Sequence, residues 1–152
     1  MTRQWFIADA GLGESLWTTV RRLPPHTGVL VLAGQMHLLP RLRRLGRQCG
    51  VIVEVERPGR VARVHNLREL RRALLRRTPL ILLSPVHPTP SHPDWKPIPR
   101  MRAAAMARLA DRRLVALGGM DARKFRRVER LGFQAWAGIS AWREGPSRER
   151  IA

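Results

Sequence analysis

The sequence predicts an α/β fold in which short buried strands alternate with amphipathic helices, either as a closed (β/α) barrel or as an open doubly wound sheet. Short apolar runs, typical of buried parallel strands, recur along the chain. Stretches between these runs carry apolar residues at helical spacing, which indicates helices with one buried face. A rigid loop of prolines, hydroxyls and imidazoles, residues 84–93, follows one apolar run, at the strand end where parallel α/β folds bind ligands.

The predicted strands and helices follow one another in regular order. The strands are residues 5–8, 29–33, 51–55, 80–84, 114–117 and 135–139. Helices over residues 14–23 and 38–49 each carry one apolar stripe: Leu16, Val20 and Leu23 in the first, and Leu38, Leu42, Leu45 and Cys49 in the second. Asn66 followed by Glu69 makes a capping box for a third helix, and Asp121 caps a fourth.

This alternation breaks at one junction. Val55 and Val61 are separated only by residues 56–60, whereas a parallel crossover needs a dozen residues or more. Pro58 and Gly59 form a turn within this segment. We therefore expect that residues 61–65 either run antiparallel to the preceding strand or lie outside the sheet.

Length and composition fit one domain with one sizeable core, since 44% of the 152 residues are hydrophobic. We expect this domain to span residues 1–143, followed by a polar tail over residues 144–152. The single cysteine, Cys49, excludes an internal disulfide, and we expect it to be buried on its helix. No run reaches the roughly 18 apolar residues of a membrane span, and residues 4–10 are too short for a signal-peptide core. We therefore expect a cytoplasmic protein without membrane contact.

The charge is strongly positive, with 29 lysine and arginine residues against 11 aspartate and glutamate residues and a formal net charge of +18. Almost all of the positive residues are arginines, and many fall within residues 41–47, 68–77 and 123–130, on separate predicted helices. No aromatic residues alternate with them. We therefore favour solvent-exposed helix faces and keep a surface for nucleic acid or a partner protein as the alternative.

Two further strand ends add candidate ligand-binding groups to the loop over residues 84–93. Gly118 and Gly119 lie between a strand and a helix start, where glycines let backbone amides approach an anion. Ser140 follows the last predicted strand. Because neighbouring parallel strands end at the same edge of a sheet, we expect these groups to converge with Thr89 and Ser91 on one phosphate site.

Three segments carry a family resemblance. They are Leu-Ser-Pro-Val-His-Pro-Thr-Pro-Ser-His at residues 83–92, Val-Ala-Leu-Gly-Gly-Met at residues 115–120 and Gly-Ile-Ser-Ala-Trp at residues 138–142. In this order and spacing they resemble the C-terminal half of the thiamine phosphate synthase and thiazole tautomerase family. Residues 64–66 and 69–70 resemble the family's preceding strand and helix start. The resemblance covers about residues 63–142, and before Val61 only the alternation of strands matches.

The resemblance implies both a fold and an activity. Family members are (β/α)8 barrels, and the synthases join a pyrimidine pyrophosphate to a thiazole phosphate with magnesium, releasing pyrophosphate. We expect a thiamine biosynthesis protein of this kind, a transferase that binds a phosphorylated thiazole, built as a TIM-type barrel shortened by about one βα unit near residues 55–61. Because the loss leaves an imperfect closure or exposed strand edges, we expect either a homodimer or a gap covered by residues 56–63.

The resemblance places the phosphate contacts in the retained half of the family site. The implied phosphate-binding residues are Thr89, Pro90, Ser91, Gly118, Gly119, Ile139 and Ser140. His92 stands where the family has a lysine that grips pyrophosphate, and we take it as a catalytic candidate although its charge near pH 7 is partial. Of the family's magnesium ligands only a carboxylate remains, Glu56, so the resemblance implies magnesium while most of its usual ligands are missing.

His65 supports an alternative activity. In the family's thiazole tautomerases a histidine after the corresponding strand transfers protons, and that reaction needs an acid/base group but no magnesium. His65 can instead serve only at the helix start. With His87 and His92 it also suggests a zinc site, for which no fourth ligand is evident. Trp95 is expected either to cover a heterocycle or to pack. The remaining alternative is a catalytically degenerate barrel that binds nucleic acid or protein through its arginines.

Overall fold

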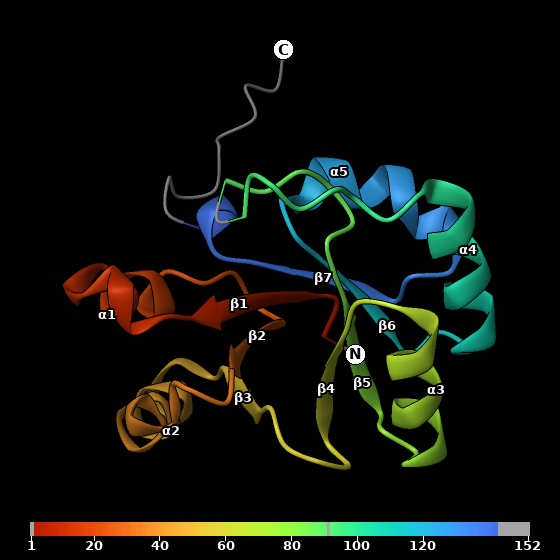
Figure 1. The fold of residues 1–152 in the computed structure, drawn as a ribbon. Coiled ribbons are helices and arrows are strands. Elements are labelled where there is room, and N and C mark those ends of the chain that lie inside the picture. Colours follow the sequence, from red (N-terminus) through yellow and green to blue (C-terminus); the bar gives the residue numbers. More distant parts are fainter. Residues whose placement is uncertain (1, 91, 143–152) are drawn as a thin grey trace.

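The computed structural model describes residues 2–90 and 92–142, which form one curled seven-stranded sheet with helices on its outer side (Figure 1). The strands are β1 (Gln4–Ala8), β2 (Thr27–Val31), β3 (Ile52–Val55), β4 (Val61–Val64), β5 (Leu80–Leu83), β6 (Leu114–Leu117) and β7 (Ala135–Gly138). The helices are α1 (Glu14–Arg21), α2 (Leu39–Cys49), α3 (Leu67–Leu75), α4 (Arg100–Leu109) and α5 (Ala122–Val128), with 3-10 helices η1 (Ala10–Leu12), η2 (Met36–Leu38), η3 (Glu129–Leu131) and η4 (Ser140–Trp142).

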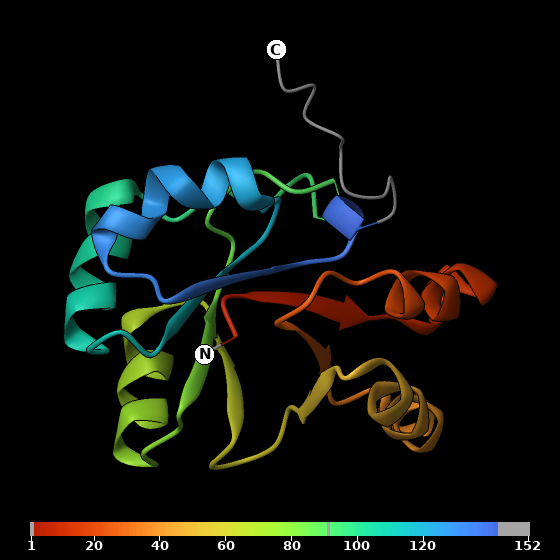
Figure 2. The ribbon, with the colours of Figure 1, turned by 180° about the vertical axis from the view of Figure 1, so that it is seen from behind.

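The sheet is a half-barrel of the TIM type. Its strand order is β3-β2-β1-β7-β6-β5-β4, and every strand pairing is parallel. Figure 2 shows from behind that α1 and α2 cover the part built from β1 to β3, while α3 and α4 cover the part built from β4 to β6. Each strand predicted from an apolar run is present within two residues of its predicted ends. The expectation of an α/β barrel is confirmed.

The helix starts predicted from capping residues are also present. Asn66 Oδ1 accepts a hydrogen bond from Glu69 N at 2.9 Å, and Glu69 Oε2 accepts one from His65 N at 2.6 Å. Asp121 Oδ1 accepts a hydrogen bond from Lys124 N at 2.8 Å. Local hydrogen bonding of this kind depends on residues three or four apart, which explains why the sequence pattern located both starts. None of the described helices is long and apolar enough to cross a membrane.

Two features of the helices differ from expectation. Cys49 is exposed at the end of α2, because the buried stripe of that helix stops at Leu45 and Gly46. Helix α4, between β5 and β6, was not predicted. Its N-cap residue, Pro99, makes no side-chain cap, and its buried face consists mainly of small side chains with little hydropathic contrast. That face is Ala103, Ala104, Met106 and Ala107.

Strand β4 corrects both expectations for the broken junction. It neither runs antiparallel in the sheet nor lies outside it, because Val61 to Val64 pair in parallel with β5. The error came from applying the crossover rule to strands that are not sheet neighbours, since β3 and β4 are the two edges of the sheet. Residues 56–60 only need to return the chain from the C-terminal end of β3 to the N-terminal end of β4. Five extended residues span roughly 17 Å, which is enough to run the length of one four-residue strand. One antiparallel bridge, Arg57 to Val61, marks this return.

Ion pairs link the two edges where the helical unit is missing. Arg60 Nη2 lies 3.1 Å from Glu54 Oε1, and Arg63 Nε lies 2.9 Å from Glu56 Oε2. We call these four residues the ion-pair seam. The shortening near residues 55–61 is therefore confirmed, and the two ion pairs reach across this junction. That residues 56–63 cover the gap stays a prediction. The homodimer stays a prediction, as does the domain boundary, because residues 143–152 lie outside the described residues.

The curl of the sheet creates an apolar interior that supports the strand ends. The interior residues come from most of the strands: Trp5, Ile7, Leu30, Val61, Leu82, Val115, Ala135 and Ala137. Gly28 is needed for this packing, since a Cβ there would lie 2.2 Å from the Trp5 ring. The interior is thus a packed core that closes the lower part of the half-barrel and leaves its C-terminal mouth to the loops.

Candidate functional site

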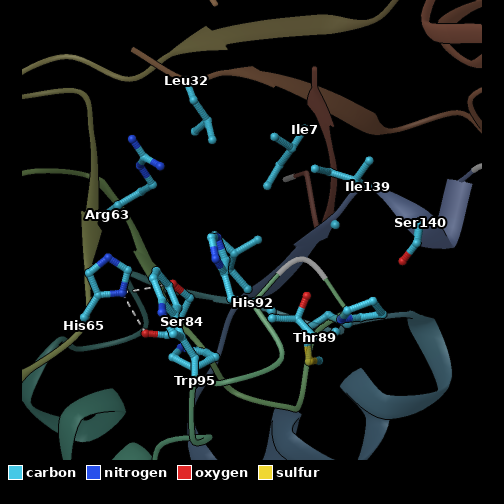
Figure 3. A pocket seen from close by; sticks show the side chains of 17 residues that line it. Ile7, Leu32, Arg63, His65, Ser84, Thr89, His92, Trp95, Ile139 and Ser140 are labelled. Atoms are coloured by element: carbon cyan, nitrogen blue, oxygen red, sulfur yellow. Dashed lines mark hydrogen bonds between the residues drawn. The ribbon is translucent and has the colours of Figure 1, made fainter. Parts of the chain in front are cut away.

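A pocket of about 310 Å³ opens at the C-terminal ends of the strands (Figure 3). This volume is in the range of small-molecule sites. Its apolar lining includes four residues that belong to the interior core or pack against it: Ile7, Leu32, Leu117 and Ile139. Met120, from the core beneath the helices, completes this apolar floor. Its walls come from β4, from the loop after β5 and from the ends of β6 and β7. We call it the mouth pocket.

The predicted phosphate-binding residues meet at this pocket. Those that line it are Thr89, Pro90, Gly118, Gly119, Ile139 and Ser140. Ser91 lies outside the described residues. They come from chain segments up to 51 positions apart, so only the parallel sheet brings them together. Their role in binding phosphate stays a prediction.

The glycine pair after β6 is shaped by the loop after β5. Gly118 and Gly119 have φ values of +98° and +59°, and a Cβ on Gly119 would lie 2.1 Å from Pro88 O. His87 N donates to Gly118 O at 3.2 Å, and Lys124 Nζ donates to Gly119 O at 2.8 Å. Only glycine fits this close approach, because any side chain would collide with the loop backbone.

Three backbone amides at the mouth have no hydrogen-bond acceptor among the described residues. Among the hydrogen bonds within residues 2–90 and 92–142, none has the amide of Gly119, Ile139 or Ser140 as its donor. All three residues line the pocket. Grouped backbone N–H donors without an internal acceptor are the usual means by which proteins hold phosphate oxygens.

His65 is held at the edge of the pocket by the backbone after β5. Its Nδ1 lies 2.9 Å from the carbonyl oxygen of Ser84 and 3.2 Å from Ser84 Oγ (Figure 3). Because a carbonyl only accepts, Nδ1 is the donor in this contact, and in the neutral tautomer that makes it, Nε2 is the basic nitrogen. The Trp95 ring lies edge to face with the His65 ring, at 5.6 Å between centroids. The imidazole is therefore oriented by two neighbours.

His92, the candidate at the family's lysine position, stacks on Trp95. The ring centroids are 3.9 Å apart, and the planes differ by 10°. Both side chains line the mouth pocket and both are exposed. Trp95 therefore forms part of the pocket wall. The predicted role of covering a heterocycle fits this position and stays a prediction.

His87 does not join the other two histidines. It lies outside the residues that line the mouth pocket, behind the glycine pair, and its Nε2 is buried without a hydrogen-bond partner among the described residues. Burial, and then the nearby Lys124 ammonium, lower the pKa of His87 below its usual 6.5. No group of three or more histidine, cysteine, aspartate or glutamate residues suitable for a metal exists within the described residues. The zinc alternative is therefore not supported by this part of the chain.

Both carboxylate oxygens of Glu56 already accept hydrogen bonds from protein groups, which does not fit a role as a magnesium ligand. Its Oε1 accepts a hydrogen bond from Arg63 Nε at 3.0 Å, and its Oε2 accepts one from Ala33 N at 3.3 Å. Magnesium prefers several oxygen ligands in octahedral geometry. With one carboxylate, already paired with an arginine, the described residues do not supply that donor set.

Arg63 is a pocket residue that the sequence analysis missed as a candidate. Among the described residues that line the mouth pocket, it is the only lysine or arginine. The strand period contained the signal, because Arg63 is two residues after the interior residue Val61 and so faces the same side of β4. The position was overlooked because neither alternative for residues 61–65 made them a parallel strand of the sheet.

Comparisons with known proteins identify the family. The family model described as thiamine monophosphate synthase matches residues 62–142, somewhat more than half of the chain. The chain belongs to this family. The matched range agrees closely with the residues that carry the resemblance in sequence, and it begins in β4, directly after the shortened junction.

Solved structures with similar folds bear titles from the same family. Thiamine phosphate pyrophosphorylase from Pyrococcus furiosus matches with a TM-score of 0.71 and 19% identity, over 92% of this chain and 86% of that chain. Thiamine phosphate pyrophosphorylase from Bacteroides thetaiotaomicron matches with a TM-score of 0.59 and 11% identity, over 100% of this chain and 90% of that chain. At these identities the matches show the fold alone. No curated protein matches the chain.

Proposed function

We propose that this chain binds a thiazole phosphate in the mouth pocket. The phosphate lies against the amides of Gly119, Ile139 and Ser140, and the ring lies over the apolar floor. The observation that carries the proposal is the group of pocket amides that donate to no other described residue. The family, whose synthases use such a ligand, supports the choice of thiazole over other phosphorylated rings.

Coupling of this ligand to a pyrimidine pyrophosphate is less well supported than binding. The family reaction needs a leaving pyrophosphate to be held, and Glu56 is engaged by Arg63 and by Ala33 N. His92, which occupies the expected lysine position, stacks on Trp95. We therefore put forward ligand binding as the function and treat coupling as an activity to be assayed with both substrates and magnesium, the product being thiamine phosphate.

Proton transfer at His65 is the second candidate function. In the neutral imidazole, the hydrogen bond from Nδ1 to the Ser84 carbonyl makes Nε2 the nitrogen that can accept a proton, as a general base requires. The residue lines the same pocket as the proposed phosphate site. These two observations favour a thiazole tautomerase reaction, which proceeds without a pyrophosphate leaving group.

The binding proposal is tested by titrating the purified protein with thiazole phosphate in a calorimeter. Gly119→Ala should weaken binding by at least about tenfold, because the new Cβ collides with the loop and displaces the amide. Gly50→Ala is the matched control, since Gly50 also has a positive φ, +68°, but nothing lies within 4 Å of its Cβ position. Binding by neither wild type nor variants, or equal binding by Gly119→Ala, would contradict the proposal.

The tautomerase candidate is tested with His65→Asn, whose amide N–H replaces the Nδ1 donor but supplies no base. We expect ligand affinity within about twofold of wild type and tautomerisation of the non-aromatic thiazole isomer, followed by NMR, to fall by about a hundredfold or more. Unchanged turnover in His65→Asn would rule out His65 as the base. Equal loss of binding would instead assign it a structural role.

A further inference from the structure

The ion-pair seam places a permanent positive charge in the mouth pocket. Arg63 extends from β4, and its guanidinium stays ionised at any physiological pH. The other lining residues that can carry positive charge are His65 and His92, and no other lysine or arginine lines the pocket within the described residues. Arg63 is thus the natural partner for any anionic group on this side of the pocket.

Glu56 fixes Arg63 in place and leaves most of its donors available. The Glu56 side chain is only 16% exposed, and its backbone N donates to Val31 O at 2.8 Å, which ties it to the end of β2. The carboxylate takes only the Nε hydrogen of Arg63, at 3.0 Å. Neither terminal Nη group of Arg63 forms a hydrogen bond with another described residue. These Nη groups are forked donors that match oxyanions.

Arg63 and the proposed phosphate site lie at different ends of the pocket. Arg63 comes from β4, an edge strand, whereas Gly119 follows β6 and Ser140 follows β7, two and three strands away in the sheet order. Figure 3 shows Arg63 and His65 on one side of the pocket and Ser140 and Thr89 on the other. A ligand whose phosphate contacts Gly119 and Ser140 therefore leaves Arg63 for a different group.

We propose that Arg63, held by Glu56, binds a second oxyanion in the mouth pocket without a metal ion. Glu56, the carboxylate expected at a magnesium site, instead positions this arginine. Because Glu56 cancels much of the Arg63 charge at long range, recognition comes from direct hydrogen bonds by the Nη groups. The chemistry fits a phosphoryl or a carboxylate group. The inference uses the pocket of the proposed function but does not depend on thiazole phosphate as its ligand.

The test measures binding of pyrophosphate and of malonate by calorimetry, each in EDTA and again with magnesium at matched ionic strength. We expect at least one probe to bind in EDTA, with an affinity that magnesium changes by less than about threefold. Arg63→Met should lower that affinity by about tenfold or more, the usual loss for a charged hydrogen bond. The preferred probe identifies the oxyanion as phosphoryl or carboxylate.

The ion-pair seam supplies matched controls. Arg60→Met removes the arginine paired with Glu54, which lies outside the mouth pocket, and should leave probe affinity unchanged. Glu56→Gln keeps Arg63 but loosens its position and should give an intermediate loss, whereas Glu54→Gln should give none. Arg63→Lys retains the charge without the fork and guards against a folding defect in Arg63→Met, with circular dichroism as the check on folding.

The outcomes separate this inference from the proposed function. Loss of probe binding in Arg63→Met, with thiazole phosphate affinity retained within about threefold, supports a second oxyanion site. Probe binding that requires magnesium, equal loss in Arg60→Met and Arg63→Met, or binding of neither probe overturns it. Equal loss of probe and thiazole phosphate in Arg63→Met also overturns it, because a single anion site then exists. Failure of thiazole phosphate to bind, with Arg63-dependent probe binding intact, contradicts only the proposed function.

Discussion

The half-barrel has two seams that are held together by different forces. At the first, β1 pairs with β7 through a parallel ladder in which Trp5 lies opposite Ala137 and Phe6 lies opposite Gly138. Trp142 Nε1 reinforces it by donating to Trp5 O at 3.3 Å. At the second, β3 and β4 share no ladder, and the ion-pair seam joins them. Backbone hydrogen bonds and buried side chains hold the first seam, whereas partly exposed charges hold the second.

The difference shows what the loss of a βα unit changes. Removing the unit eliminates one stretch of ladder but leaves the core beneath the remaining strands, since interior residues come from strands on both sides of the gap. In place of the lost strand pairing, the charged side chains of the ion-pair seam lie between β3 and β4. We therefore expect the ion-pair seam to contribute little stability, while its Arg63 lines the mouth pocket.

The largest expected effect concerns the ladder seam. Phe6 is fully buried on β1, so Phe6→Ala should lower the free energy of unfolding by about 3–5 kcal/mol. The measurement is urea denaturation, with Leu75→Ala as a control, since Leu75 is 85% exposed and its loss should cost less than about 0.5 kcal/mol. A cost below about 1 kcal/mol for Phe6→Ala would show that the core packed against β1 at the first seam is not a principal source of stability.

A much smaller effect is expected at the ion-pair seam. Arg60 and Glu54 are 50% and 28% exposed, so Arg60→Met should change the free energy of unfolding by no more than about 1 kcal/mol. Because salt screens exposed charges, the difference from wild type should shrink at high ionic strength. Denaturation in low and high salt tests this. A loss comparable to that of Phe6→Ala would mean that the seam, and not the ladder, closes the sheet.

The smallest effect is a pH dependence that we assign to neither seam. His87 has a lowered pKa, so the unfolded chain binds a proton more readily than the folded chain below about pH 6.5. Above that pH, the titration of His87 does not change the free energy of unfolding. As the pH falls toward the pKa of His87 in the folded state, the free energy of unfolding decreases. His87→Phe should therefore reduce the loss of stability between neutral and mildly acidic pH, whereas Arg60→Met should not. Denaturation across this pH range would show an unchanged slope in His87→Phe if the assignment is wrong.

Much of the fold was predictable because local patterns determine local structure. The apolar runs identify the buried strands, and Asn66 and Asp121 locate two helix starts through hydrogen bonds to residues three positions later. The motif segments after β5, β6 and β7 also predicted which residues converge at the mouth. Helix α4 escaped because alanine on its buried face differs little from its surroundings in hydropathy.

The sequence by itself determined the alternation of strands and helices, the family and the loops that line the pocket. Only the tertiary structure decided that β4 joins the far edge of the sheet, that the pocket amides donate to no other described residue, and that Glu56 holds Arg63. The physical reason is range: burial periodicity and caps act over a few residues, whereas these contacts join Ala33, Glu56 and Arg63 across the two edges of a curled sheet. Which edges approach depends on the curl of all seven strands, and no short segment encodes it.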